Sequence, residues 1–311
     1  MPRVMELEAS FRNNRVFVRA AGWDGHPLTF WTDSGGGAMI SPDVVRRLGL
    51  TVGPRQLDGE RYPAVVDAPH LEEPFPAISG PLIVGDLPTY AEGADGLLGQ
   101  AWHADRVWTY DYPGRRLYSG NALAAAGHDV HVAALGFLTD GQGRRTNAFP
   151  RIEATIDGVV WSFLLDTGAT LALTDAAATR LQGALPPLGG TCFASDSLIE
   201  EWTARHPDWP CVPGGDAILG GTLVRVPHVT IAGCRVGPVW FTSRPDANFT
   251  KLMSQWMDRP VHGALGGSLF QYCQILIDYP RAEATFAIPT SAAPANRATS
   301  PIPGGRDPLG H

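Results

Sequence analysis

The sequence contains a long internal repeat, which constrains the fold more than any other feature. Residues Phe30 to Leu48 lie without a gap on residues Phe163 to Leu181 when one half of the chain is aligned with the other. The aligned stretches share two triplets, Asp33-Ser34-Gly35 and Asp166-Thr167-Gly168. Coincidence is a poor explanation for a repeat of this length, so the chain is expected to form two similar units.

Each triplet follows an apolar run, which predicts a strand that leads into a tight turn. Phe163, Leu164 and Leu165 precede the second triplet, and Leu171 and Leu173 follow it. Such flanks would bury the aspartate, and a buried carboxylate is costly unless it is paired or hydrogen-bonded. One Asp-Thr-Gly turn alone is ambiguous, because similar triplets occur in ordinary turns. Its duplication favours a pair that works together.

The length and composition agree with two lobes. A chain of 311 residues that is 44% hydrophobic and 18% charged can bury two cores. We expect an N-terminal lobe over 1–122, a connection over 123–147 and a C-terminal lobe over 148–289. The longer spacing in the second half predicts an insertion near 182–215. The Pro-, Ala-, Ser- and Gly-rich end, 290–311, predicts a disordered tail.

Local signals predict many short strands and a few helices. Turn residues separate apolar runs of strand length along most of the chain, which predicts an all-β fold. Capping residues and apolar spacing predict the exceptions. The expected helices are Val44 to Leu48 after Ser41, Asp175 to Leu181, Ser195 to Arg205 and Asn248 to Met257.

Two homologous Asp turns imply a pseudo-twofold axis, which would bring Asp33 and Asp166 face to face. Two neighbouring carboxylates cannot both ionise readily, so they share one proton. One carboxyl group is then a general base and the other a general acid, with a water molecule between them. This chemistry suits the hydrolysis of an amide and needs no Ser or Cys nucleophile.

The doubled motif resembles the aspartic peptidases of the pepsin and retropepsin type. The resemblance includes the apolar-apolar-Gly motifs Leu97-Leu98-Gly99 and Ala264-Leu265-Gly266 and extends over both lobes. It implies an all-β bilobal fold of two homologous β-barrel-like lobes with short helices, and an active-site cleft between the lobes. It also implies an endopeptidase that binds extended peptides, with Ser34 and Thr167 bracing the two turns.

The same resemblance implies a β-hairpin flap over the cleft. The Asp58-Gly59 turn lies where a retropepsin-like flap tip would fall, and Tyr62 is the nearby candidate for a flap tyrosine. One position departs from the family pattern. Pepsins have Ser or Thr after the catalytic Gly, whereas this chain has Gly36 and Ala169. Losing that hydroxyl favours the protonated carboxyl group, so we expect a working pH above pepsin's strongly acid range.

Several classes of partner and cofactor are not expected. The net charge of −7 argues against nucleic acid. No apolar run is long enough for a transmembrane helix, and the N-terminus does not resemble a signal peptide. We therefore expect a cytoplasmic monomer without a pro-segment. The nine histidines show no metal-binding spacing, and there is no Cys-x-x-Cys pair, so neither a metal nor a cofactor is predicted.

The four cysteines all lie in the second half and leave two alternatives open. In a reducing compartment they would be free buried thiols. In an exported protein they could instead form the pairs Cys192–Cys211 or Cys234–Cys273.

The sequence also leaves alternatives for the function. The two Asp turns could be structural caps, although the intact apolar-apolar-Gly motifs argue against this interpretation. The Asp pair could perform non-hydrolytic acid/base chemistry on a small molecule, or the chain could be an inactive peptide-binding module. Asp111 and Asp278 each precede Tyr-Pro at a hairpin, and we interpret both as structural.

Overall fold

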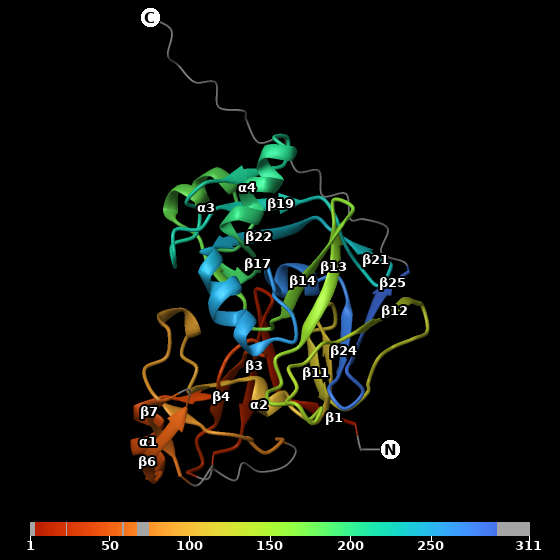
Figure 1. Ribbon diagram of the computed structural model, residues 1–311. Coiled ribbons are helices and arrows are strands. Elements are labelled where there is room, and N and C mark those ends of the chain that lie inside the picture. Colours follow the sequence, from red (N-terminus) through yellow and green to blue (C-terminus); the bar gives the residue numbers. More distant parts are fainter. Residues whose placement is uncertain (1–3, 23, 58, 67–74, 291–311) are drawn as a thin grey trace, which may run out of the picture.

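Short paired strands form most of the structure, a computed structural model that describes residues 4–22, 24–57, 59–66 and 75–290. Figure 1 shows the N-terminal half as the lower lobe and most of the C-terminal half as the upper lobe. The predicted all-β bilobal class is confirmed. The predicted tail lies outside the described residues, apart from Thr290.

The N-terminal half forms an eight-stranded sheet. Its strands in spatial order are β2 (Ala9–Arg12), β3 (Arg15–Ala20), β4 (Leu28–Thr32), β9 (Gly96–Leu98), β5 (Met39–Ile40), β8 (Ile83–Val84), β7 (Glu60–Val65) and β6 (Val52–Leu57). β4 pairs with β9 in parallel, and β5 pairs with β8 in parallel. The strand before the first Asp turn therefore lies beside the first apolar-apolar-Gly motif.

The C-terminal half repeats this arrangement in a nine-stranded sheet. Its strands in spatial order are β18 (Cys211–Val212), β19 (Leu223–Val226), β22 (Val239–Arg244), β17 (Cys192–Ser195), β23 (Gly263–Leu265), β14 (Val159–Leu165), β13 (Arg151–Ile156), β20 (Val229–Ile231) and β21 (Cys234–Val236). β14 pairs with β23 in parallel, and β17 pairs with β22 in parallel. The two sheets thus have equivalent centres.

The chain reaches these equivalent places by different routes. β5 follows the first Asp turn directly, whereas β17 comes only after β15 (Thr170–Ala172), α3 (Asp175–Leu181) and β16 (Leu188–Gly190). β15 and β16 form a separate two-stranded sheet. Part of the range 182–215, predicted as an insertion, therefore contains β17, a central strand of the sheet.

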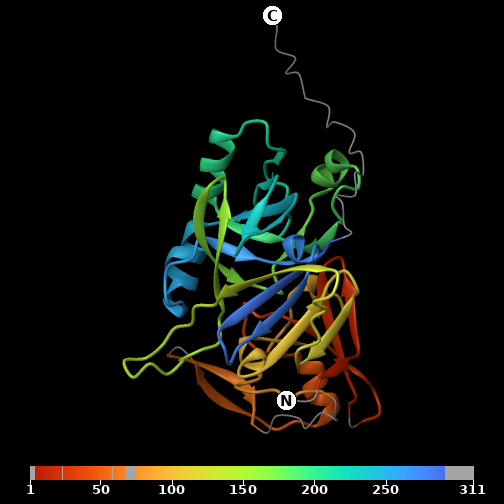
Figure 2. The ribbon, with the colours of Figure 1, turned by 90° about the vertical axis from the view of Figure 1, so that its right-hand side faces the viewer.

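A six-stranded sheet joins the two halves. Its strands in spatial order are β1 (Met5–Leu7), β11 (Arg116–Ser119), β10 (Val107–Asp111), β24 (Gln274–Asp278), β25 (Glu283–Pro289) and β12 (His128–Ala134). Figure 2 shows the blue β24 and β25 beside the yellow hairpin of the N-terminal half. The central antiparallel pair, β10 with β24, contains one strand from each half. The pseudo-twofold axis inferred from the repeat passes between these two strands.

The capping signals located the main helices. α1 (Pro42–Leu48) begins after Ser41 and α4 (Asp196–Arg205) after Ser195, whose side chains accept hydrogen bonds from backbone N–H groups. α3 has the predicted bounds. The predicted helix over 248–257 is a π-helical turn, η2 (Asn248–Leu252), followed by a 3₁₀ turn, η3 (Met253–Trp256). Three further short helices are η1 (Thr89–Ala91), α2 (Gln100–His103) and α5 (Gly267–Phe270).

The largest hydrophobic cluster contains side chains from both sheets and from the six-stranded sheet between them. Trp102, Trp108, Tyr110 and Tyr279 are among its largest fully buried members. All four cysteines are free thiols, and three of them are buried. In the part of the chain that the structure describes, no helix has the length and apolar character needed to span a membrane.

Candidate active site

Each Asp turn is hydrogen-bonded to the strand of its apolar-apolar-Gly motif. The backbone N–H of Asp33 donates to the Leu98 carbonyl (2.9 Å), and that of Asp166 donates to the Leu265 carbonyl (2.8 Å). The motif strands are buried, so they offer a rigid support to the turns. This explains why both motifs occur in both halves of the sequence.

Ser34 and Thr167 join the two turns across the lobe boundary. The Ser34 N–H donates to Thr167 Oγ1 (3.1 Å), and the Thr167 N–H donates to Ser34 Oγ (3.0 Å). The Ser34 hydroxyl also donates to the carbonyl of Leu165 (2.8 Å). All three residues are buried. These reciprocal hydrogen bonds hold the turns in one relative position, with the two Asp carboxyl groups adjacent.

The glycines of the triplets leave room for the opposite carboxyl group. A Cβ atom on Gly35 would lie 2.6 Å from Asp166 Cγ, and one on Gly168 would collide with Asp33. A Cβ atom on Gly36 would collide with Asp33 Oδ2. The unusual Gly36 therefore does more than omit a hydroxyl group, since a side chain there would require the Asp33 carboxyl group to shift.

The environments of the two carboxyl groups differ. Asp166 is 8% exposed, while Asp33 is only partly buried. Burial, the negative charge of Asp166 and a hydrogen bond with it raise the pKa of Asp33 well above its usual range. Burial also raises the pKa of Asp166, but hydrogen bonds from Asp33 and from the backbone of Gly168, Ala169 and Gly35 oppose this rise. The two adjacent carboxyl groups therefore titrate as one coupled pair that holds a proton between them.

The predicted flap residues form the end of a hairpin. β6 and β7 pair up to Leu57 and Glu60, and Gly59 has a φ of +83° at the tip. Asp58 lies outside the described residues. Tyr62 lies on β7, and its hydroxyl donates to Glu60 Oε2 (2.6 Å). The role of this hairpin as a flap stays a prediction.

Tyr90 is a residue of the site that the sequence analysis missed. It lies in η1, half-buried, with its ring against Trp31 at 5.9 Å between centroids. Burial and the charge of Asp33 raise its pKa, while the Arg244 cation opposes the rise. The phenol therefore lies within electrostatic reach of the dyad. A single Tyr in a short 3₁₀ turn carries no sequence pattern that would have marked it.

A buried ion pair lies beside the second Asp turn. Arg244 Nη1 donates to Asp216 Oδ2 (2.8 Å), and Arg244 Nη2 donates to the Thr170 carbonyl (3.3 Å). Asp216 also accepts from the Ala172 N–H (3.1 Å). The pair thus ties β15, which follows the second turn, to β22.

The site offers carboxyl, hydroxyl and backbone groups for chemistry. Among the described residues, no cluster of three or more His, Cys, Asp or Glu side chains could hold a metal ion. Asp111 and Asp278 lie elsewhere, where each caps a hairpin by accepting from Gly114 N–H (2.9 Å) and Arg281 N–H (3.0 Å), respectively.

Comparison with solved structures identifies the architecture. An aspartic proteinase from Irpex lacteus matches with a TM-score of 0.53 over 93% of this chain and 99% of that chain. The chain has the pepsin-like fold. The two sequences are 10% identical, so the likeness concerns the fold. No family model and no curated protein matches the sequence.

Proposed function

We propose that the protein is an aspartic endopeptidase that hydrolyses peptide bonds with a water molecule activated between Asp33 and Asp166. One observation carries the proposal: two carboxyl groups on pseudo-symmetric turns are braced together, and the proximity of each raises the proton affinity of the pair. The pepsin-like fold of the chain supports it.

The asymmetry of the dyad suggests a role for each carboxyl group. We assign the charge to Asp166, because backbone N–H groups of Gly168, Ala169 and Gly35 stabilise its ionised form, so Asp166 accepts a proton from the water as the water attacks the peptide carbonyl. Asp33 carries the proton and donates it to the carbonyl oxygen. The resulting diol intermediate breaks down when the amide nitrogen receives a proton from the dyad. No covalent bond forms between enzyme and substrate.

The decisive experiment is incubation of the protein with a random peptide library. We expect internal cleavage, with one oxygen atom from solvent water in each new carboxyl group. The control is a double variant, Asp33→Asn with Asp166→Asn, prepared in the same way. Binding without cleavage would support a peptide-binding module instead, and neither binding nor cleavage would leave acid/base chemistry on a small molecule.

The pH dependence of cleavage is a second prediction. The dyad is active while Asp166 is ionised and Asp33 is protonated, and the pKa of both groups is raised. The acid limb of the rate profile should therefore lie above the usual Asp pKa of about 3.9, and the alkaline limb well above it. A kcat profile measured from pH 2 to 8 checks this. A maximum below about pH 3 would contradict it.

A further inference from the structure

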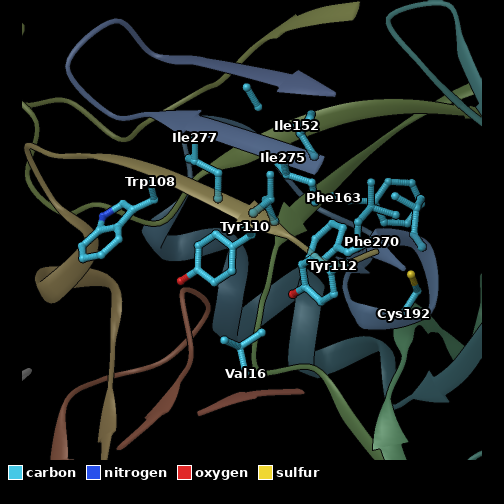
Figure 3. Packing of buried hydrophobic residues seen from close by; sticks show 14 of the residues in the cluster. Val16, Trp108, Tyr110, Tyr112, Ile152, Phe163, Cys192, Phe270, Ile275 and Ile277 are labelled. Atoms are coloured by element: carbon cyan, nitrogen blue, oxygen red, sulfur yellow. The ribbon is translucent and has the colours of Figure 1, made fainter. Parts of the chain in front are cut away.

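A buried chain of hydrogen bonds joins α2 to β10 in the N-terminal half. His103 at the end of α2 and Tyr110 on β10 are both fully buried. His103 Nε2 lies 2.7 Å from Tyr110 Oη, and His103 Nδ1 lies 3.0 Å from the Gly99 carbonyl oxygen. Figure 3 shows Tyr110 among the packed side chains of this region, on the same face of its strand as Tyr112.

The chemistry of the groups fixes the direction of this chain. The Gly99 carbonyl can only accept, so the hydrogen of the neutral imidazole is on Nδ1 and Nε2 accepts from Tyr110. The Tyr110 oxygen is then left to accept. Its partner is Thr167, which follows Asp166, whereas the hydroxyl group of Thr32, which precedes Asp33 and also adjoins Tyr110, donates to the Val16 carbonyl (3.1 Å). The hydrogen-bond chain therefore ends at Thr167 of the second Asp turn.

Thr167 links these hydrogen bonds to the dyad. Its Oγ1 accepts the N–H of Ser34, so it is part of the brace between the turns. A hydroxyl group that donates to Tyr110 presents a lone pair to Ser34 in a fixed direction. His103 and Tyr110 thus orient the brace through Thr167.

The second half of the chain supplies an internal comparison. Each half carries a short helix after its apolar-apolar-Gly motif and a strand that ends in Asp-Tyr-Pro. At the equivalent places the second half has only apolar side chains. The three pairs are His103 with Phe270, Tyr110 with Ile277, and Thr32 with Leu165.

This difference argues for a function of the polar set. The second half shows that Phe, Ile and Leu fill these positions in a well-packed core, since Phe270, Ile277 and Leu165 are fully buried. Burying three polar side chains requires that each finds a partner, which apolar side chains do not. Apolar side chains thus suffice for packing at the equivalent places of the second half, whereas the polar set of the first half adjoins the second Asp turn at Thr167.

We propose that His103 and Tyr110 are positioning residues for the Asp33–Asp166 dyad, which act through Thr167. The proposal rests on the proposed function, because it names residues that support the same reaction. His103 is uncharged through most of the expected pH range, since burial lowers its pKa to about 4. The other titratable or charged groups around the pair are Arg106, Tyr112 and Tyr279.

The test compares three variants in kcat, KM and pH profile. Tyr110→Phe and His103→Phe should lower kcat about 10- to 100-fold, because small displacements of catalytic groups have effects of this size. They should also shift the limbs of the pH profile and leave KM nearly unchanged. The control is Tyr279→Phe, since Tyr279 is also fully buried beside His103 but its hydroxyl has no hydrogen-bond partner among the described residues. This variant should behave like the unaltered protein.

Other outcomes separate this proposal from the proposed function. If Tyr110→Phe matches Tyr279→Phe in kcat and pH limbs, the positioning role is wrong. If a single variant folds poorly, the double variant His103→Phe with Tyr110→Ile copies the second half and is measured in its place. If the unaltered protein cleaves no peptide, the proposed function fails. Carbon-13 NMR titration of the Asp carboxyl groups then still tests the positioning role, which requires different titration curves for Tyr110→Phe and Tyr279→Phe.

Discussion

Asp33→Asn is expected to lower the rate of peptide hydrolysis by about 10³- to 10⁴-fold and, at pH 7, to raise the stability of the protein. The rate falls because an amide cannot donate the proton that Asp33 supplies to the carbonyl oxygen, and general acid–base catalysis contributes effects of this order. Initial rates on a peptide selected from the library, measured at the pH optimum, test the first half of the prediction.

The stability gain follows from the pKa of Asp33. This pKa is raised well above its unfolded value by burial and by the charge of Asp166. The folded protein therefore binds the proton more tightly than the unfolded chain, and its stability falls as the pH rises from about 4 toward the folded pKa. An Asn side chain has no such dependence. The difference in unfolding free energy between Asp33→Asn and the unaltered protein should vanish near pH 3.5 and grow toward pH 7.

A matched control is Asp111→Asn, because Asp111 lies on a hairpin turn away from the dyad. It should retain its activity and show no stability gain at pH 7. If Asp33→Asn is equally destabilised at pH 3.5 and pH 7, Asp33 is a structural cap. A cap is not repelled by the charge of Asp166, so its replacement would give no stability gain that grows with pH.

The dyad and the fold class could be predicted because the signals for them are local and duplicated. Asp33 and Asp166 each stand on a tight turn after an apolar strand, and the repeat implies an axis that brings them together. Helix starts were equally accessible, since Ser41 and Ser195 cap α1 and α4 through hydrogen bonds to residues only three positions away.

The route of the chain after the second turn could not be predicted. The gapless repeat aligns Met39 and Ile40 with Ala172 and Leu173, yet the strand that occupies the place of β5 is β17. The register of a strand depends on neighbours that are distant in sequence, such as β22 and β23. Similar local patterns therefore gave no indication that the chain makes a detour through β15, α3 and β16.

The buried polar contacts around the dyad were also beyond the sequence analysis. Tyr110 meets Thr167, and Arg244 meets Thr170 and Asp216, over long sequence separations. A lone His or Arg in an apolar context is compatible with many arrangements, and its partner is set only when the sheets pack. The comparison of the two halves, position by position, would have singled out His103 and Tyr110.

Asp216→Asn is expected to lower the free energy of unfolding by about 3–5 kcal/mol, the usual effect of removing one partner from a buried ion pair. The Asp216 side chain is fully buried, and that of Arg244 is 6% exposed. Burial already lowers the pKa of Arg244, and the charge of Asp216 opposes this. Without the carboxylate, the guanidinium group stays in the interior with no compensating charge. Urea unfolding at pH 7 measures the loss.

Two comparisons decide whether the buried charge is the cause. Glu8→Gln breaks the Arg19–Glu8 pair, which has the same 2.8 Å separation but is exposed, and should change the stability by less than about 1 kcal/mol. The double variant Asp216→Asn with Arg244→Met also removes the unpaired guanidinium group and should recover most of the lost unfolding free energy. If the double variant is no more stable than Asp216→Asn, the disturbed hydrogen bonds from the Ala172 and Leu219 N–H groups account for the effect instead, because Asn keeps only one of the two acceptor oxygens. Because those bonds hold the strand after the second Asp turn, peptide hydrolysis should then remain impaired in both variants.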